Sequence, residues 1–321
     1  MNGAASTPLP PALAELRGRD LLSSADLTAD QIRALLQLAG DLKAGRSSVD
    51  LVGRTLGLIF TKSSTRTRVS FTVAMARLGG QTIDLNPQVS QVGRGEPVAD
   101  TARVLSRYVD ALAIRTFAQS ELEEYAHWAS IPVINALTDL EHPCQALADY
   151  LTLAECFGGL QGLTLSYVGD GNNVAHSLLL CGALLGVNVR IGCPPGFEPS
   201  AQVLDHARQL AGGRSSIEVS HDPVAAVRGA HGLYTDVWAS MGQEQEQRQR
   251  EQAFAGFCLD ENLLAEADPR AIVLHCLPAH RGEEISAGVI EGSASRVFDQ
   301  AENRLHVQQA LLAALLGGLA G

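Results

Sequence analysis

The stretch TLGLIFT (residues 55–61), followed by KSSTRTR (62–68) and VSFTVAMARL (69–78), decides how this chain folds. Its first part is a short, almost continuous apolar run, which is typical of a strand buried in a parallel sheet. Its last part has helical character, so the polar residues between them lie where a strand leads into a helix. The stretch therefore predicts a strand, a turn and a helix, the unit from which α/β folds are built.

The turn of this unit combines hydroxyl residues with two arginines, Arg66 and Arg68. A helix start presents unpaired backbone N–H groups and the positive end of the helix dipole. Guanidinium and hydroxyl donors added there make a site for a dianion, most simply a phosphate. The same residues also suit an ordinary helix cap with arginines on the exposed face, so both interpretations stay open for this segment alone.

The alternation of short apolar runs and helical segments continues along the chain. Strands are expected at 55–61, 81–85, 111–117, 132–136, 163–169, 188–192, 216–220, 232–238 and 271–277, and helices at 66–78, 97–107, 119–128, 142–157, 173–186, 200–211, 222–228 and 301–316. This pattern predicts an α/β protein with two doubly wound parallel-sheet domains, because parallel strands need crossover helices that cover both faces. We expect the long helix 142–157 to join the two domains.

Composition restricts the classes of function. The chain has 321 residues and a formal net charge of −11, so it has no basic surplus for binding nucleic acid or an acidic membrane in general. Its six cysteines form no C-x-x-C pair, which is typical of reduced residues in a cytoplasmic protein. No secretory signal and no apolar run long enough to cross a membrane is expected.

Polar residues gather where the predicted strands end, which is where α/β proteins place their sites. They are Arg115, HPCQ (142–145), GDGNN (169–173), DVWASMG (236–242) and HCLP (275–278). Any one of them is compatible with an ordinary polar loop. Because five such strand ends are spread over both domains, together they indicate an active site in the cleft between the domains.

Several common sites do not fit the sequence. A dinucleotide loop starting at Gly169 would need glycine at position 174, which is Val174. A metal site at His275 and Cys276 is disfavoured, because adjacent residues on a strand face opposite ways and hard-metal carboxylate clusters are missing. We therefore expect no metal and no cofactor. The polar run GQEQEQRQREQ (242–252) is equally compatible with a mobile lid and with a solvated insertion.

Taken together, these segments resemble the aspartate/ornithine carbamoyltransferase family from about Asp20 to the C-terminus. The residues that carry the resemblance are STRTR (64–68), QVGRGE (91–96), Arg115, HPCQ (142–145), GDGNN (169–173), DVWASMG (236–242), HCLP (275–278) and ENR (302–304). The SMG and HCLP motifs are similar to those of the family members that use ornithine. No departure is found at these positions, and the first ~19 residues look like a variable extension.

The resemblance implies transfer of the carbamoyl group from carbamoyl phosphate to the δ-amine of L-ornithine, giving L-citrulline and phosphate in arginine metabolism. It implies a carbamoyl phosphate-binding domain over 1–141, with helix 301–321 packing back on it, and an ornithine-binding domain over 142–300. It also implies a homotrimer in which Gln91 reaches into the site of the neighbouring subunit.

The resemblance further assigns roles to individual residues. Carbamoyl phosphate would be bound by Ser64, Thr65, Arg66, Thr67, Gln91, Arg115, His142, Pro143, Cys144, Gln145, Cys276, Leu277 and Arg304, and ornithine by Asn173, Asp236, Ser240 and Met241. Those expected to take part in catalysis are Arg66, Arg115, His142, Gln145 and Cys276.

The chemistry of these residues suits the reaction. Charge builds on the carbonyl oxygen and the departing phosphate, and arginine, threonine and histidine donors stabilise it. Two alternatives stay open: carbamoylation of putrescine or an acylated ornithine on the same scaffold, and a non-catalytic binding paralogue. Asp236 with the SMG loop favours a free amino acid, and intact His142, Gln145 and motif arginines argue against the paralogue.

Overall fold

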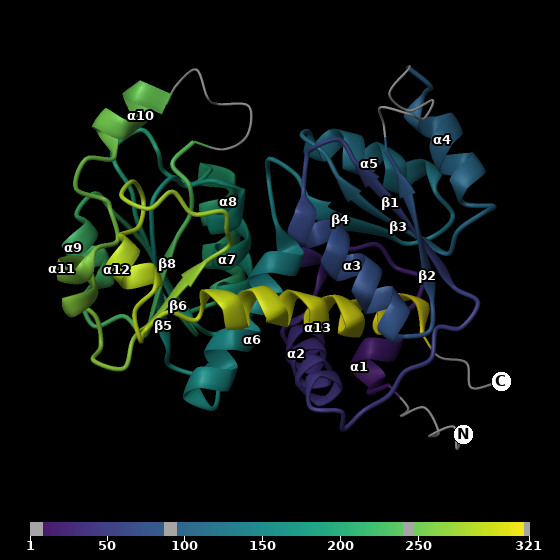
Figure 1. Cartoon of the computed structure of the whole chain (residues 1–321), viewed down its shortest axis with the longest axis horizontal. Helices are drawn as coiled ribbons and strands as arrows, with labels where there is room; N and C mark the ends of the chain where they lie inside the picture. Colours follow the sequence, from purple (N-terminus) through teal and green to yellow (C-terminus); the bar gives the residue numbers. More distant parts are fainter. Residues whose placement is uncertain (1–8, 87–94, 240–246, 318–321) are drawn as a thin grey trace. The chain divides into compact units, whose positions relative to one another are not determined.

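A computed structural model of the chain describes residues 9–86, 95–239 and 247–317. The chain divides into two compact units (Figure 1). The first unit consists of two segments, the chain up to Ala148 and the chain from Glu302 onward. The second unit is Asp149–Ala301. The chain passes between the units within two helices, α6 (Pro143–Phe157) and α13 (Val297–Leu316).

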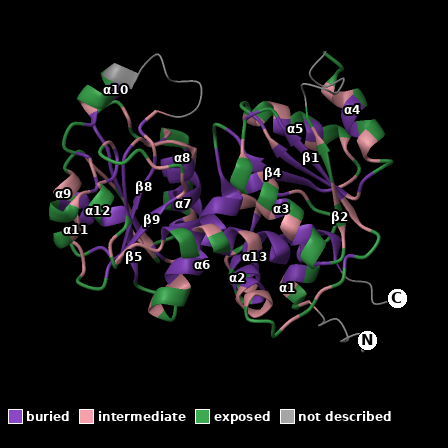
Figure 2. Cartoon of the chain, viewed as in Figure 1, coloured by how far each residue is buried: buried purple, intermediate pink, exposed green. Residues whose placement is uncertain are grey.

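The first unit is built around a four-stranded sheet of order β2-β1-β3-β4, in which every pair is parallel. Its elements are α1 (Pro11–Ala14), η1 (Ser24–Asp26), α2 (Ala29–Lys43), β1 (Thr55–Phe60), α3 (Thr65–Arg77), β2 (Gln81–Leu85), α4 (Val98–Leu105), β3 (Ala111–Arg115), α5 (Gln119–Trp128) and β4 (Val133–Leu137). The inner strands β1, β3 and β4 are buried almost throughout (Figure 2), as their apolar runs predict.

The second unit holds a five-stranded parallel sheet of order β7-β6-β5-β8-β9. Its elements are β5 (Thr164–Val168), α7 (Asn173–Leu185), β6 (Asn188–Gly192), α8 (Ala201–Ala211), β7 (Ile217–Ser220), α9 (Pro223–Val227), β8 (Gly232–Thr235), α10 (Gln247–Ala253), α11 (Glu261–Ala265), β9 (Ile272–His275) and α12 (Ala287–Ile290). One apolar cluster joins β8 and β9 to the segment around Trp238, Phe254 and Phe257.

Glycine is required where β5 turns into α7. A Cβ built on Gly171 would lie 2.2 Å from the backbone nitrogen of Pro199, a distance that no side chain tolerates. The Gly171 N–H also donates to the carbonyl of Phe197 at 2.8 Å. The turn therefore lies directly against the 197–199 backbone, and this contact fixes where α7 begins.

The structure confirms the α/β class and the two parallel sheets. Every strand and helix expected from the sequence is present, with ends that differ by a few residues. The assignment of ligands to residues 1–141 and 142–300 stays a prediction. Among the described residues, no helix is long and apolar enough to cross a membrane.

Candidate active site

Three neighbouring strands of the first unit end at one edge of its sheet. β3 pairs with both β1 and β4, with Phe60 opposite Arg115 and Arg115 opposite Leu137. The chain runs from β1 into α3 and from β4 through residues 138–142 into α6. The start of α3, Arg115 and His142 therefore lie at the carboxyl ends of parallel strands, as the sequence predicts.

Ser64 and Thr65 start α3 in the manner of a regular helix cap. Ser64 is extended, and its hydroxyl accepts the Thr67 N–H at 3.3 Å. This satisfies one of the unpaired donors of the first turn and leaves the others directed beyond the helix end. Arg66 is exposed, whereas Thr67 is fully buried. The structure therefore shows a regular helix cap at these residues, and the anion site stays a prediction.

Arg304 of α13 connects the start of α3 to α6 within the first unit. Its two terminal nitrogens donate to Gln145 Oε1 at 3.0 Å and to Thr67 Oγ1 at 2.8 Å. All three side chains are at most 4% exposed. Hydrogen bonds from a buried guanidinium are strong and directional, so Arg304 fixes the orientation of the Gln145 amide and the Thr67 hydroxyl.

His142 lies beside this network and is itself buried. Burial holds the pKa of His142 well below its ordinary value, and the positive charges of Arg304, Arg115 and Arg66 lower it further. The imidazole is therefore neutral at physiological pH and suited to hydrogen bonding. Three arginine charges around one neutral histidine make surroundings that favour an anion.

Pro143 and Cys144 follow His142 in the first turn of α6. Proline suits that position, because its missing N–H has no helical partner there anyway. Cys144 is fully buried, and its thiol lies 3.7 Å from the carbonyl oxygen of Asn135. Burial raises the pKa of the Cys144 thiol to about 12. The thiol is therefore protonated and unreactive at neutral pH.

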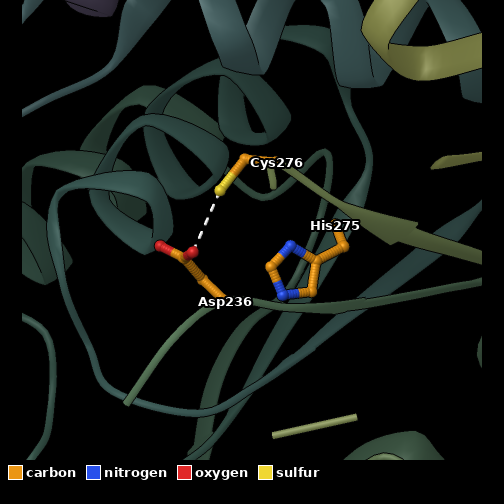
Figure 3. Close-up of side chains that lie close together, drawn as sticks. All are labelled: Asp236, His275 and Cys276. Carbon is orange, nitrogen blue, oxygen red and sulfur yellow. Dashed lines mark hydrogen bonds between the residues drawn. The ribbon is translucent and has the colours of Figure 1, made fainter. Parts of the chain in front are cut away.

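A second group of polar residues lies at the ends of β8 and β9 in the second unit. Asp236 follows β8, Cys276 follows β9, and the two strands are parallel neighbours. The Cys276 thiol donates to Asp236 Oδ1 at 3.0 Å (Figure 3). Asp236 is 6% exposed and Cys276 is half-buried. The structure therefore brings together a carboxylate and a thiol that the sequence placed on separate motifs.

His275 supports this group through its backbone and its ring. Its Nδ1 accepts the Leu277 N–H at 2.8 Å, so the proton of the neutral ring is on Nε2, which donates to Glu284 Oε1 at 3.1 Å. The His275 N–H donates to Gln300 Oε1 at 2.9 Å. Leu277 has a φ of 58°, unusual for a residue other than glycine. The buried pair of His275 and Glu284 therefore holds Leu277 in a strained conformation.

The expectation that His275 and Cys276 face opposite ways is wrong. β9 ends at His275, so strand alternation no longer applies to Cys276, and the ligand atoms of Asp236, His275 and Cys276 lie within 4.8 Å of one another. Both ring nitrogens of His275 are nevertheless engaged in hydrogen bonds, with Leu277 and Glu284. The cluster in Figure 3 is therefore better suited to hydrogen bonding than to ligating a metal with His275.

The remaining predicted site residues fall in two groups. Asn173 is the first residue of α7 and is half-buried, next to the turn that follows β5. Gln91, Ser240 and Met241 lie outside the described residues. Their assignment therefore stays a prediction.

The polar run 242–252 is only partly what the sequence suggested. From Gln247 it forms α10, and Arg250 is 7% exposed. The Arg250 guanidinium donates to Asp170 Oδ2 at 2.7 Å and to the Trp238 carbonyl at 2.8 Å, and it lies over the Phe197 ring. A solvated insertion is therefore wrong for this part of the run. The composition gave no signal that one arginine among glutamines is buried.

Sequence reasoning also missed three side chains that hold the site in place. Asn172 belongs to a quoted motif but received no role, and its amide contacts Asp236. Glu284 and Gln300 lie outside the quoted motifs, and both contact His275 in the fold. A single polar residue without a pattern carries no signal in one sequence, so these three were not detectable in advance.

Family comparisons cover both parts of the chain. Residues 19–155 match the family model described as "Aspartate/ornithine carbamoyltransferase, carbamoyl-P binding domain". Residues 161–315 match the model described as "Aspartate/ornithine carbamoyltransferase, Asp/Orn binding domain". Together the two matches include every described residue that the sequence assigned to the site.

Curated relatives and solved structures agree with these matches. The chain is 75% identical over 307 residues to an ornithine carbamoyltransferase of Prochlorococcus marinus, covering 96% of each chain. It is 73% identical to that of Parasynechococcus marenigrum, covering 96% of this chain and 97% of the relative. The crystal structure of the Gloeobacter violaceus enzyme is 57% identical, with a TM-score of 0.86 over 94% of this chain and 100% of that one. The Pyrococcus furiosus structure is 51% identical, with a TM-score of 0.91 over 95% and 99%.

Proposed function

The chain belongs to the aspartate/ornithine carbamoyltransferase family, and from that membership we propose how its residues divide the work of catalysis. Its activity is the ornithine carbamoyltransferase reaction. The carbamoyl group of carbamoyl phosphate passes to the δ-amine of L-ornithine, which gives L-citrulline and phosphate in arginine metabolism.

The first unit binds carbamoyl phosphate in this proposal. The backbone and hydroxyls of residues 64–67 hold the phosphate at the start of α3, where the helix dipole favours an anion. Arg66 and Arg115 supply the charges that balance it. His142 and Gln145 contact the carbamoyl group, with Pro143 and Cys144 shaping the turn. The supporting observation is the buried link from Arg304 to Gln145 and Thr67, because it fixes these groups before substrate arrives.

The second unit binds ornithine. Asp236 pairs with the α-ammonium, Asn173 contacts the amino acid, and Ser240 and Met241 complete the set from outside the described residues. Cys276 and Leu277 contact carbamoyl phosphate at the reacting end of ornithine, as the resemblance implies. Asp236 suits this role because it is a buried carboxylate whose orientation is set by neighbouring donors.

The reaction then needs little beyond alignment and charge stabilisation. Carbamoyl phosphate already carries a good leaving group, so no covalent enzyme intermediate is required. The neutral δ-amine attacks the carbonyl carbon, phosphate leaves with the C–O bonding electrons, and it takes the proton that nitrogen loses. Arg66, Arg115 and neutral His142 stabilise the charge on the carbonyl oxygen and phosphate.

The proposal extends to assembly and location. From the family resemblance, we expect a homotrimer in which Gln91 of one subunit completes the site of the next, as a cyclic interface allows. We expect the enzyme to act in the cytoplasm, in line with six cysteines spread singly along the chain. Gln91 lies outside the described residues.

Calorimetric titration with carbamoyl phosphate tests the assignment of the phosphate site. We expect Arg66→Ala to weaken binding by about 10- to 100-fold, the loss of one or more charge-assisted hydrogen bonds. Arg33→Ala is the matched control, because Arg33 is an exposed arginine of the same unit that pairs with its helical neighbour Asp30. Equal affinities for the two variants would remove Arg66 from the phosphate site.

A further inference from the structure

Asn172 is the cap of α7, and its side chain also reaches Asp236. Its Oδ1 accepts the N–H groups of Val174 at 2.9 Å and Ala175 at 3.2 Å. Its Nδ2 donates to Asp236 Oδ2 at 2.9 Å. One amide thus joins the turn after β5 to the carboxylate after β8, two strands that are neighbours in the sheet.

The orientation of the Asn172 amide is determined by its surroundings. Turning it over would place the NH₂ group against two backbone N–H donors and the carbonyl oxygen against the Asp236 carboxylate. The Tyr167 hydroxyl, at 3.3 Å from Oδ1, adds a further donor on the same side. Serine and aspartate cap helices well, but aspartate has no donor, and serine has a single oxygen where the amide presents a separate acceptor and donor. The position therefore demands an acceptor and a donor at once.

The donors around Asp236 also indicate where a substrate would bind. Oδ1 accepts from the Cys276 thiol at 3.0 Å and from the Val237 N–H at 2.8 Å, and Oδ2 accepts from Asn172. A carboxylate accepts about four hydrogen bonds. Among the described residues, Oδ2 therefore has one donor and room for a second, while Oδ1 already has two. An ammonium group would bind at Oδ2, beside the Asn172 amide.

We propose that Asn172 is a positioning residue for ornithine, holding Asp236 Oδ2 in the direction that accepts the α-ammonium. The proposal rests on the proposed role of Asp236 in binding ornithine. Without the amide, Oδ2 loses its one donor among the described residues, and the carboxylate is held through Oδ1 alone, so substrate binding must also fix the direction of Oδ2. Binding of carbamoyl phosphate does not involve this contact.

Substitutions that keep the cap separate this role from a structural one. We expect Asn172→Ser to retain a capping oxygen and a melting temperature within about 2 °C of wild type, since Ser and Asn cap equally well. We expect its KM for ornithine to rise about 10- to 100-fold, the range for a hydrogen bond to a charged group. The dissociation constant for carbamoyl phosphate should stay within about twofold, less than the effect of a typical lost hydrogen bond. Asn172→Ala loses cap and donor together and should also melt earlier.

Asn172→Asp strengthens the comparison, because aspartate caps as well as asparagine but brings a second carboxylate against Asp236. Its KM for ornithine should exceed that of Asn172→Ser, since like charges at this distance repel. If Asn172→Ser instead leaves the KM for ornithine within twofold of wild type, the positioning role is wrong. If Asn172→Ser weakens both substrates equally and melts like Asn172→Ala, the residue is only a cap.

A double-mutant cycle distinguishes failure of this inference from failure of the role of Asp236. If Asn172 acts through Asp236, Asn172→Ser should change the KM for ornithine by less than about twofold in an Asp236→Asn background, because the two effects are not additive. If the effects of Asn172→Ser and Asp236→Asn on the KM for ornithine are fully additive, the inference is overturned. An Asp236→Asn enzyme with unchanged ornithine KM would overturn the assignment of Asp236 itself.

Discussion

We predict that Glu284→Ala lowers the free energy of unfolding of the second unit by about 1–3 kcal/mol, because it orphans one buried donor, the ring N–H of His275, and removes the acceptor of the partly exposed His280 N–H. Glu284 is fully buried. Its Oε1 accepts His275 Nε2–H at 3.1 Å and the His280 N–H at 2.6 Å. The His275 ring is buried, with 1% of the residue exposed, so bulk water does not solvate it in the intact fold.

Urea titration followed by tryptophan fluorescence measures this loss. The chain has two tryptophans, and Trp128→Phe leaves Trp238 as the reporter of the second unit. Trp238 stacks on Phe254 at 5.4 Å and belongs to the same apolar cluster as Ile285, next to Glu284. The midpoint and slope of the transition then give the free energy in this background for each variant.

Glu283→Ala is the matched control, one residue away. The Glu283 side chain is 39% exposed and pairs with His280 at 3.5 Å, so its removal should cost about 0–1 kcal/mol. The reasoning is refuted if Glu284→Ala costs less than about 1 kcal/mol, the lower limit for a single orphaned donor. It is also refuted if the two alanine variants are equally destabilised.

Three further predictions concern titration and assembly. The rate at fixed total ornithine should rise from pH 6 to 8.5, because only the neutral δ-amine attacks and free amines have a pKa near ~10.4; a flat profile would contradict this. The pKa of His142 is lower in the folded chain than in the unfolded chain, so as the pH falls the unfolded chain takes up a proton on this histidine first. Protonation therefore favours unfolding, and the free energy of unfolding decreases as the pH falls below about 6.5. The melting temperature should therefore decrease more steeply between pH 7 and pH 5 for wild type than for His142→Gln. Equal decreases in the two proteins would show that His142 is not the cause. Inactive Arg66→Ala and Gln91→Ala chains, unfolded and refolded together, should recover activity toward about one quarter of wild type if the site is shared in a cyclic trimer; hybrids no more active than their parents would rule that out.

The fold and the strand-end residues could be predicted because they depend on local patterns. Apolar runs ending before Arg115, Asp236 and Cys276 indicate parallel strands, and parallel strands bring such ends to one edge. The contact between Asp236 and Cys276 follows from their neighbouring strands, although 40 residues separate them. The helix start at residues 64–67 and its cap are local as well, whereas the assignment of phosphate binding to these residues stays a prediction.

The supporting side chains could not be predicted because their partners are distant in sequence. Gln300 donates to Asp149 at 2.6 Å and to Tyr234 at 3.2 Å while accepting the His275 N–H, a network set only by tertiary packing. Arg250 is surrounded by polar residues in sequence, yet it is buried against Asp170. The error at His275 and Cys276 had a local cause: the strand ends earlier than the pattern indicated, and alternation fails beyond it.

Citrulline formation by the purified chain tests the central claim most directly. Carbamoyl phosphate is supplied with L-ornithine, putrescine, an Nα-acylated ornithine or aspartate, and carbamoylated product and phosphate are measured together. We predict one phosphate per citrulline, and a kcat/KM for ornithine that exceeds each alternative by about 10³ or more, because each leaves the groups around Asp236 unpaired or clashing. Equal or better use of putrescine or the acylated ornithine, or no citrulline at all, would contradict the claim.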